Sequence, residues 1–404
     1  MKYEVVVVGA GPAGSTAAKF LSESGVNVLL VDKSKFPRDK PCGGGLPLRV
    51  FNRFSYIKKD LIDSYSYATF AYSPSLKYHM ELERNEPLIA MVLREKFDYE
   101  LLKIAMESGT NFIEGKIVQN IKITENSAKI FLNDGTAIES EIVIGADGVW
   151  STIAKKTGLR ADYKNICICL FEEYNLDKKI LDRFFGEKRT CHIHLSVNKT
   201  VGYGWVFPKK EHLNIGISEF RHAKDSNKSK STIKENYETY IRILKESNII
   251  PRNLKKENCR GAALPTYPLE KTYSDRVILC GDAAGFANPM TGEGIYHAMV
   301  SGKIAADIIK KALEKHNTSE KFFSRYQKIW KKDFGKDLKI LYKTSKLWGS
   351  DNEKLIDIIC LDKKLGEYGV DAIIGRIGAR KCRKKMIRRL IYLKLFNRIN
   401  GKNK

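Results

Sequence analysis

The stretch that decides the fold is Tyr3-Glu4-Val5-Val6-Val7-Val8-Gly9-Ala10-Gly11-Pro12-Ala13-Gly14. Residues 3–8 are a short apolar, β-branched run that predicts a buried strand, and residues 15–23 predict a helix. Residues 26–31 predict a second strand, which ends at Asp32. The glycines therefore stand at the first turn of a βαβ unit, in the pattern Gly-x-Gly-x-x-Gly, and an acidic residue follows the second strand.

Each residue of this pattern has a physical reason in a dinucleotide-binding turn. Gly9 allows the tight turn, Gly11 lets the backbone approach a pyrophosphate, and Gly14 lets the helix pack closely on the strand. The free N–H groups and the dipole of the helix N-terminus attract the anion. Asp32 would accept hydrogen bonds from the adenosine ribose. The pattern predicts a Rossmann-like domain in an α/β protein.

Composition limits the class of protein. The chain has 404 residues, 43% of them apolar, which is enough for about two to four domains. It contains no run of about 18 apolar residues, so we expect no spanning helix. The eight cysteines form no Cys-x-x-Cys pair, so we expect no metal site. A nucleotide-type loop at Gly9 leaves no room for a signal peptide, and we expect a cytoplasmic protein with reduced thiols.

The charge of the chain is strongly basic and unevenly placed. Lys and Arg number 71 against 47 acidic residues, giving a net charge of +24, and residues 372–404 hold 12 Lys and Arg and no acid. Nucleic acid and an anionic membrane are the two obvious partners, and a Lys-rich codon usage is the bland alternative. Basic stripes over the whole body would favour nucleic acid. A basic end favours contact with a membrane surface.

Further turns divide the chain into three regions. Residues 36–47 are rich in Gly and Pro, and the three glycines at 43–45 suit a backbone pressed against a flat ligand, although a flexible loop is the alternative. Residues 165–220 contain short alternating runs that predict an antiparallel sheet. We predict a discontinuous dinucleotide-binding domain (1–50, 90–155 and 270–315), an inserted sheet domain for substrate (51–89 and 156–269), and a helical basic C-terminal region (316–404).

Three markers together resemble a known fold. They are the first glycine turn with Asp32, the turn Gly145-Ala146-Asp147-Gly148, and Gly281-Asp282 before Pro289-x-x-Gly292-Glu293-Gly294. This set resembles the FAD-dependent hydroxylase-like flavoproteins. The segments Pro41-Cys42-Gly43-Gly44-Gly45-Leu46 and Tyr203-Gly204-Trp205-Val206-Phe207-Pro208 look like the geranylgeranyl reductase family, most of all its archaeal digeranylgeranylglycerophospholipid reductases.

The resemblance implies a role in binding FAD for residues from all parts of the predicted domain. Gly9, Gly11, Ala13, Gly14 and Asp32 would hold the ADP part; Cys42, Gly43 and Gly45 would line the isoalloxazine; Arg94 would meet the diphosphate or ribityl; Val118 would touch adenine through its backbone; and Asp282, Gly294 and Ile295 would complete the flavin site. An ordinary surface cation is the alternative for Arg94.

Two pairs of residues at alternating positions each share a strand face. Tyr203 and Trp205 would wall the substrate cavity, and a pair of core aromatics is the alternative. His192 and His194 also share a face, but a metal pair there is the less favoured hypothesis.

The implied chemistry needs a proton donor beside the flavin. An isoprenoid double bond is not conjugated to a carbonyl, so hydride attack alone would leave an unstabilised carbanion. Proton donation to the less substituted carbon avoids this, in an apolar site that excludes water. Cys42 is the one titratable side chain of the flavin-facing loop, and a thiol keeps its proton at neutral pH. Cys42 is therefore the candidate catalytic donor, with packing against the ring as the alternative.

We expect a reductase that saturates geranylgeranyl chains of archaeal membrane ether-lipid precursors, as a step of phospholipid biosynthesis. Alternatives are a geranylgeranyl diphosphate or other isoprenoid-chain reductase, a flavin monooxygenase or halogenase on the same fold, and a basic binding protein that has lost FAD. The sequence carries no second dinucleotide fingerprint, so electrons would come from ferredoxin, reduced deazaflavin or visiting NAD(P)H. We expect peripheral attachment to the inner face of the cell membrane through the basic C-terminal segment, and no nucleic acid partner.

Overall fold

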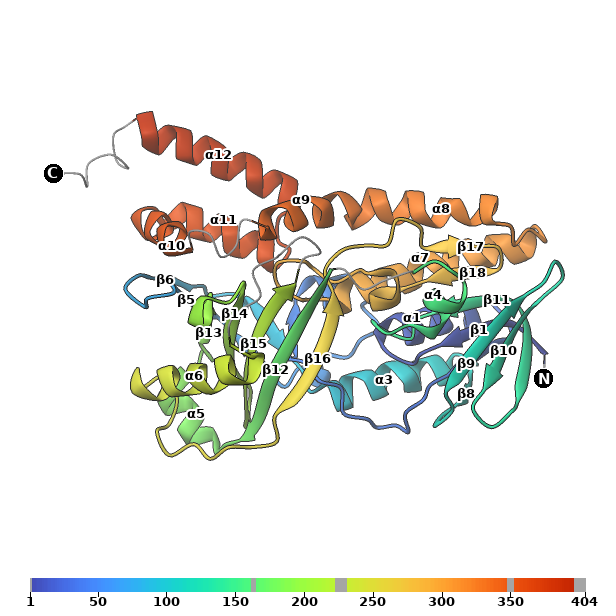
Figure 1. Cartoon of the computed structure of the whole chain (residues 1–404), viewed down its shortest axis with the longest axis horizontal. Coiled ribbons are helices and arrows are strands. Elements are labelled where there is room, and N and C mark those ends of the chain that lie inside the picture. The colour runs from blue at the N-terminus through green and yellow to red at the C-terminus, as the bar shows by residue number, and fades with distance from the viewer. Residues whose placement is uncertain (1, 161–164, 222–230, 347–351, 396–404) are drawn as a thin grey trace. The chain divides into compact units, whose positions relative to one another are not determined.

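A computed structural model describes residues 2–160, 165–221, 231–346 and 352–395 of the chain (Figure 1). The chain divides into two compact units. Unit 1 comprises Met1–Lys40, Arg94–Ile166 and Leu264–Lys339, and unit 2 comprises Pro41–Leu93, Cys167–Ala263 and Ile340–Lys404. Compactness alone does not define a functional domain, so the domain assignment made from the sequence stays a prediction.

Unit 1 contains an eight-stranded sheet that includes the expected βαβ unit. Strand β1 (Lys2–Val8) lies between β11 (Ala137–Gly145) and β2 (Val28–Val31), and all three are parallel. The valines of β1 are buried because both faces of a parallel sheet are covered, which explains the continuous apolar run. The remaining strands are β8 (Asn111–Ile113), β9 (Val118–Ile123), β10 (Ala128–Leu132), β17 (Tyr273–Ser274) and β18 (Val277–Leu279).

Helices cover the sheet of unit 1. Helix α1 (Pro12–Ser22) packs on α7 (Ile295–Glu314) so closely that a Cβ at Gly302 would lie 2.3 Å from the Ala13 carbonyl oxygen. Helix α1 also contacts α3 (Arg94–Glu107). The other helical segments are α4 (Thr152–Lys156), α8 (Glu320–Trp330), a π-helical turn at Lys331–Gly335, and α9 (Lys336–Ser345), which runs past the end of the unit.

Unit 2 is built on a seven-stranded sheet in the order β16-β12-β15-β14-β13-β5-β6. Its strands are β5 (Ala68–Tyr72), β6 (His79–Glu83), β12 (Ile166–Asn175), β13 (Cys191–Leu195), β14 (Gly202–Pro208), β15 (His212–Arg221) and β16 (Arg260–Pro265). A smaller sheet pairs β7 (Ile89–Met91) with β3 (Gly45–Pro47) and β4 (Ser64–Ser66), and a short helix α2 (Arg49–Arg53) follows β3.

The two faces of the seven-stranded sheet have different neighbours. Helices α5 (Lys178–Phe185) and α6 (Ile233–Glu246) lie on one face (Figure 1). The apolar core between them and the sheet includes Phe185, Tyr240, Val206 and Ile215. Because side chains alternate along a strand, the neighbours of Val206 on β14 point to the opposite face. That face carries the candidate substrate residues.

Three helices close the C-terminal part of unit 2: α10 (Asn352–Leu361), α11 (Lys363–Ile373) and α12 (Ala379–Leu395). Helices α10 and α11 contact β6, and Arg84 pairs with Asp371 of α11 at 2.7 Å. Helix α12 packs on α11, where Arg389 donates to the Asp362 carboxylate at 2.5 Å. None of the helices in the described part of the chain is long and apolar enough to span a bilayer.

The predicted elements are mostly confirmed, with two differences. Helix α5 interrupts the strands of residues 165–220, and its Asp177 N-cap accepts from the Lys179 N–H. Within residues 165–220, β14 pairs antiparallel with β13 and with β15 as expected, but β5, from outside this range, adds a parallel partner to β13. The polar pattern of residues 224–248 also predicts a helix, which is present as α6 from Ile233 onward; residues 222–230 lie outside the described part.

Candidate active site

The glycine turn of unit 1 has no room for side chains at two of its positions. Gly9 has a φ of +103°, and a Cβ there would lie 2.3 Å from the Ala146 carbonyl oxygen. A Cβ at Gly14 would lie 1.8 Å from the Gly9 oxygen. Gly11 is the N-cap of α1 and supplies no side-chain acceptor, so the first-turn N–H groups, including that of Ala13, can face an anion.

Asp32 holds this turn and still has acceptor capacity. One carboxylate oxygen accepts from the Ala10 N–H at 2.7 Å, and the other accepts from the Ser34 N–H at 2.8 Å. A carboxylate has about four acceptor positions, so each oxygen can take a further donor such as a ribose hydroxyl. The short side chain therefore fixes the end of β2 to the glycine turn.

Two arginines share one buried carboxylate beside the turn. Arg94, the first residue of α3, donates to Asp98 through Nε at 2.8 Å and through Nη2 at 2.7 Å. Arg38 pairs with the same carboxylate at 3.0 Å, and Asp98 is fully buried. Arg94 is thus not an ordinary surface cation.

Arg38 also adjoins the glycine turn. Its Nη2 is the nearest heavy atom to a Cβ built at Gly11, at 3.7 Å, and its buried Nη1 has no hydrogen-bond partner among the described residues. An unsatisfied guanidinium N–H beside a helix N-terminus suits a diphosphate oxygen. Arg38 and Asp98 were not predicted from the sequence, although Arg94 and Asp98 stand at the i, i+4 spacing of a helical ion pair.

Asp282 lies half-buried in the turn before α7. Burial raises the pKa of this carboxyl group, and the positive charges of Lys40, Arg94 and Arg160 oppose the rise. Arg160, missed by the sequence analysis, donates to the backbone oxygen of Asp282 at 3.2 Å. A Cβ at Gly294, the N-cap of α7, would lie 3.2 Å from Asp282 Oδ1. The unit therefore gathers positive charge around one half-buried acid.

The remaining predicted positions of unit 1 lie at the ends of its elements. Ile295 begins α7, and Val118 begins β9, where its side chain is buried. Asp147 of the second glycine turn accepts from the Ser151 hydroxyl at 2.5 Å and from the Ile153 N–H at 3.1 Å. Asp147 therefore organises the start of α4.

These residues fit FAD. The turn excludes Cβ atoms where a diphosphate needs close approach, the α1 N-terminus has no side-chain cap, and Arg38 has an unsatisfied buried N–H. The role of each residue toward FAD stays a prediction.

The cysteine loop belongs to unit 2. Cys42 is half-buried, and its Sγ accepts the Gly44 N–H at 3.4 Å. Gly44 has a φ of +77°, and a Cβ there would lie 2.2 Å from the Val92 oxygen, so a side chain would push the loop off β7. Cys42, Gly43 and Gly45 are described with this unit, so their contact with the flavin stays a prediction.

An aromatic face of β14 adjoins this loop. Tyr203 and Trp205 share a face as predicted, with ring centroids 5.9 Å apart, and Phe207 continues the row at 6.2 Å. A Cβ at Gly43 would lie 3.0 Å from the Phe207 ring and 3.3 Å from the Trp205 indole nitrogen. Burial raises the pKa of Tyr203, and the neighbouring thiols of Cys169, Cys167 and Cys42 add to this. Phe207 was not predicted as a wall residue, although strand alternation places it on the same face as Tyr203 and Trp205.

The histidine pair lies on the other face of this sheet. His194 stacks on Tyr72 with centroids 4.3 Å apart, and its Nδ1 lies 2.9 Å from the Tyr240 hydroxyl. Burial lowers the pKa of His192 to about 4 and that of His194 to about 3, the latter also through His192. The part of the chain that the structure describes holds no cluster of three or more metal-ligating side chains.

Comparisons with known proteins support an FAD-binding fold. The family model described as an FAD binding domain matches residues 2–326. An uncharacterised protein of Methanosarcina barkeri is 33% identical over 319 residues, covering 78% of this chain and 76% of its own. A digeranylgeranylglycerophospholipid reductase of Methanococcus vannielii is 31% identical over 365 residues, which cover 87% of this chain and 88% of that protein.

A solved structure has the same fold. The crystal structure of a geranylgeranyl bacteriochlorophyll reductase-like protein from Thermoplasma acidophilum matches with a TM-score of 0.77 at 24% identity, over 89% of this chain and 91% of that one. Fold and site together define an FAD-dependent oxidoreductase with the hydroxylase-like flavoprotein fold. Within this class, the chain belongs to the geranylgeranyl reductase family of FAD-binding proteins.

Proposed function

We propose that this protein saturates the C=C bonds of geranylgeranyl chains on archaeal membrane ether-lipid precursors. The names of its relatives support this substrate class. The observation that carries the proposal is the packing of the cysteine loop on the aromatic face of Trp205 and Phe207. A half-buried thiol beside an apolar wall suits an uncharged chain that needs one proton and little water.

The residues of unit 2 divide the work in this proposal. Tyr203, Trp205 and Phe207 hold the isoprenoid chain by apolar contact and keep water from it. The Gly44 N–H fixes Cys42 Sγ, and the thiol donates its proton to the less substituted alkene carbon. Positive charge then develops on the tertiary carbon. When bound and reduced, FAD would supply hydride to that carbon, and the Cys42 thiolate would regain a proton from solvent once the saturated chain has left.

The residues of unit 1 serve FAD binding in this proposal. The glycine turn and Arg38 receive the diphosphate, Asp32 the ribose, and Asp282 with Gly294 the ribityl side. The electrons come from ferredoxin, reduced deazaflavin or NAD(P)H.

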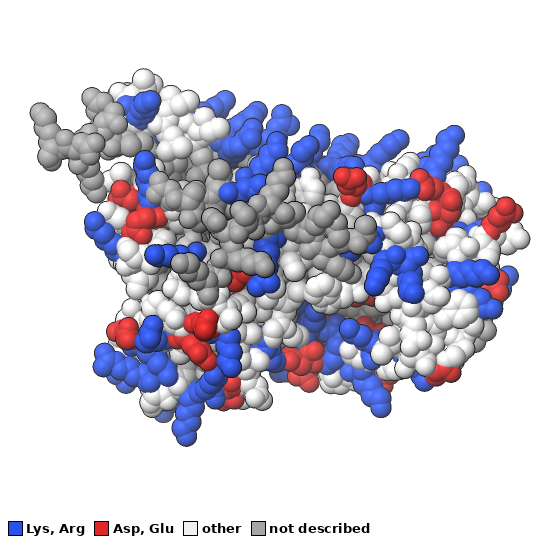
Figure 2. All heavy atoms as spheres, in the orientation of Figure 1, with Lys and Arg blue, Asp and Glu red and all other residues white. Residues whose placement is uncertain are grey.

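The membrane is the proposed partner surface, on the cytoplasmic face of the cell membrane. Of the large hydrophobic side chains that are exposed, Ile387, Ile391 and Leu395 follow one another at helical spacing on α12. Over α12, Figure 2 shows uncharged surface beside Lys and Arg side chains. Apolar residues flanked by cations support contact with anionic lipid, weakened by salt.

Mass spectrometry of the lipid product tests the proposed function. Dithionite-reduced protein is incubated with an unsaturated digeranylgeranyl ether phospholipid, with geranylgeranyl diphosphate, or with an aromatic compound under oxygen. We expect the mass of the ether lipid to rise in steps of two hydrogens. Reduction of the diphosphate alone would assign the substrate to a free isoprenoid, and an oxygen-dependent aromatic product would overturn the proposal.

A further inference from the structure

A buried polar network lies beside the cysteine loop in unit 2. Asn214 on β15 is fully buried, and its Nδ2 donates to Glu173 Oε2 at 2.5 Å and to the Cys42 carbonyl oxygen at 3.4 Å. Its Oδ1 accepts from the Trp205 indole N–H at 2.7 Å. One side-chain amide therefore joins the cysteine loop to the aromatic face.

The orientation of the Asn214 amide follows from its partners. An indole nitrogen can only donate, so the amide oxygen must face Trp205. The amide nitrogen then faces Glu173, whose carboxylate can only accept when it is ionised. A flipped amide would set two donors against each other at Trp205 and two acceptors against each other at Glu173.

Glu173 is itself fixed by a buried cation. Lys209 Nζ donates to Glu173 Oε1 at 2.8 Å, and only 2% of the lysine side chain is exposed. Lys209 Nζ also lies 3.3 Å from the position of a Cβ at Gly44, so the lysine contacts the cysteine loop directly. The ion pair holds Glu173 Oε1 and leaves Oε2 facing the Asn214 amide nitrogen.

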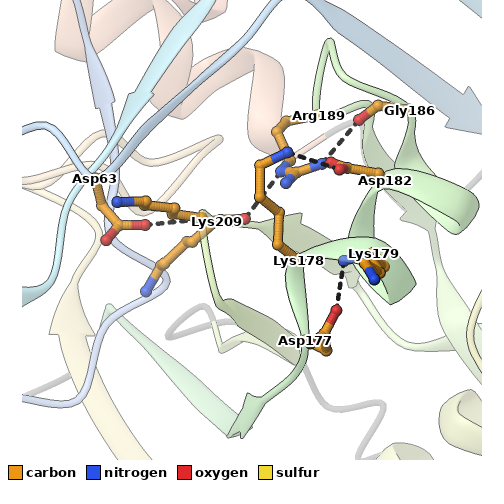
Figure 3. Close-up of polar contacts among 9 residues, drawn as sticks. Asp63, Asp177, Lys178, Lys179, Asp182, Gly186, Arg189 and Lys209 are labelled. Atoms are coloured by element: carbon orange, nitrogen blue, oxygen red, sulfur yellow. Dashed lines mark hydrogen bonds and ion pairs between the residues drawn. The ribbon is translucent and has the colours of Figure 1, made fainter.

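The backbone that carries Lys209 is held from two sides (Figure 3). Arg189 Nε donates to the Lys209 carbonyl oxygen at 3.0 Å, and Arg189 also pairs with Asp182 of α5. Asp63 accepts the Lys210 N–H at 2.7 Å, and the Asp63 N–H donates to the Met91 oxygen of β7. The turn between β14 and β15 is therefore tied to both α5 and the smaller sheet.

We propose that Asn214, oriented by the Glu173–Lys209 ion pair, is a positioning residue that sets the Cys42 loop and the Trp205 indole together. Asn214 acts through Cys42 and Trp205 and takes no part in proton transfer. The effect of Asn214 on lipid reduction rests on the proposed function, whereas its effect on the position of the cysteine loop is independent of that function.

The test is the alkylation rate of Cys42 by iodoacetamide in the FAD-loaded full-length protein, measured by peptide mass spectrometry. Asn214→Asp keeps the size of the side chain but sets a carboxylate oxygen against both Glu173 and the Cys42 carbonyl. We expect Cys42 to react about five-fold faster, since one net hydrogen bond is worth roughly 1 kcal/mol. The exposed Cys259 and Cys360 are internal controls and should keep their rates.

Asn236→Asp is the matched control variant, because Asn236 is also fully buried in unit 2 but bonds to Asn198 and Ser231 instead. We expect it to leave Cys42 alkylation unchanged. If Asn214→Asp does not fold, Glu173→Gln also tests whether the orientation of Asn214 sets the cysteine loop. With its amide oxygen toward Lys209, the new glutamine would set its NH2 group against the NH2 group of Asn214. An unchanged Cys42 rate with full FAD occupancy overturns the proposal, and so does an equal rise in Asn236→Asp.

Failure of this proposal and failure of the proposed function can be told apart. If the wild-type protein reduces no isoprenoid lipid but Asn214→Asp still speeds Cys42 alkylation alone, the positioning role stands and the substrate assignment fails. If lipid is reduced and the Cys42 rate does not respond, the positioning role fails.

Discussion

Arg94 binds Asp98 with two hydrogen bonds, from Nε to Oδ1 and from Nη2 to Oδ2, at 2.8 and 2.7 Å. The residues are one turn apart on α3, and the aspartate is fully buried. A bidentate pair fixes the plane of the guanidinium, which a point contact would not do. The arginine that the family resemblance assigns to FAD is thus held in position by its own helix.

Asp98→Asn should weaken FAD binding although Asp98 is not expected to touch FAD. The change leaves Arg94 and Arg38 without their shared charge partner, and breaking a buried pair costs about 3 kcal/mol of unfolding free energy. The measurements are flavin absorbance per chain after gel filtration and thermal unfolding of the apoprotein. Asp134→Asn is the control, because Asp134 pairs with Lys116 in an exposed position of the same unit. Equal FAD retention in both variants would contradict the prediction.

Gly294→Ala should lower FAD affinity by crowding Asp282. Gly294 has a φ of −122°, which alanine adopts readily, so no backbone strain is expected. Its Cβ would lie 3.2 Å from Asp282 Oδ1 and would move the carboxylate. We expect the dissociation constant to rise about tenfold, which corresponds to roughly 1.4 kcal/mol. Gly369→Ala, where a Cβ meets no atom within 4 Å, should bind FAD like the wild type.

Cys42→Ala should keep FAD and lose most lipid reduction. Loss of a general acid costs about 100-fold or more in rate, whereas loss of a packing contact costs far less. Cys42→Ser keeps a hydroxyl at this position and should retain part of the activity. The measurement is turnover with reduced enzyme at matched flavin occupancy. Wild-type turnover in Cys42→Ala would remove the donor role and favour the packing alternative.

Stability should fall in mild acid because of the buried histidine pair. The ordinary pKa of 6.5 falls on folding to about 4 for His192 and about 3 for His194. The folded state therefore binds fewer protons, and the stability present above pH 6.5 is lost as the pH falls toward these values. Linkage gives up to about 2 kcal/mol per histidine at pH 5. Urea unfolding from pH 7.5 to 5 should show this loss.

His194→Gln should reduce this pH dependence by about half, because one of two linked protons is removed. Its amide oxygen can still accept from Tyr240. The control is His316→Asn, because His316 is exposed and its φ of +48° suits asparagine. If the slope against pH is the same in His194→Gln as in the wild type, the buried pair is not its source.

Residue patterns within a single strand or turn correctly predicted the β1–α1 turn and the shared face on β14. The run of valines and the glycine turn of β1–α1 follow from burial and turn geometry, and the shared face of Tyr203 and Trp205 follows from strand alternation. The contact between Asn214 and Cys42 joins residues 172 positions apart. It depends on how β3 and β15 are brought together, and no spacing in the sequence indicates this.

Among the residues of unit 1 that were not predicted, one makes a local contact and one makes a long-range contact. Asp98 could have been found from Arg94, because helical ion pairs have a fixed spacing. Arg160 could not, since it reaches the backbone of Asp282 from 122 positions away.

In unit 2, helix α5 was not predicted because its eight residues are too few for a clear helical period among strands.

Replacing the exposed isoleucines of α12 should weaken membrane binding without loosening the helix. Leu393 and Cys382 are buried and Arg389 pairs with Asp362, so α12 is held by residues other than Ile387 and Ile391. The double variant Ile387→Ser, Ile391→Ser should bind anionic liposomes at low salt about tenfold less, since each loses apolar area in the lipid interface. Ile117→Ser, Ile329→Ser is the matched control, because these isoleucines of unit 1 are similarly exposed. Deletion of residues 380–404 should abolish sedimentation while FAD stays bound. Equal sedimentation of the deletion and the full-length protein would show that the anchor lies elsewhere on the chain.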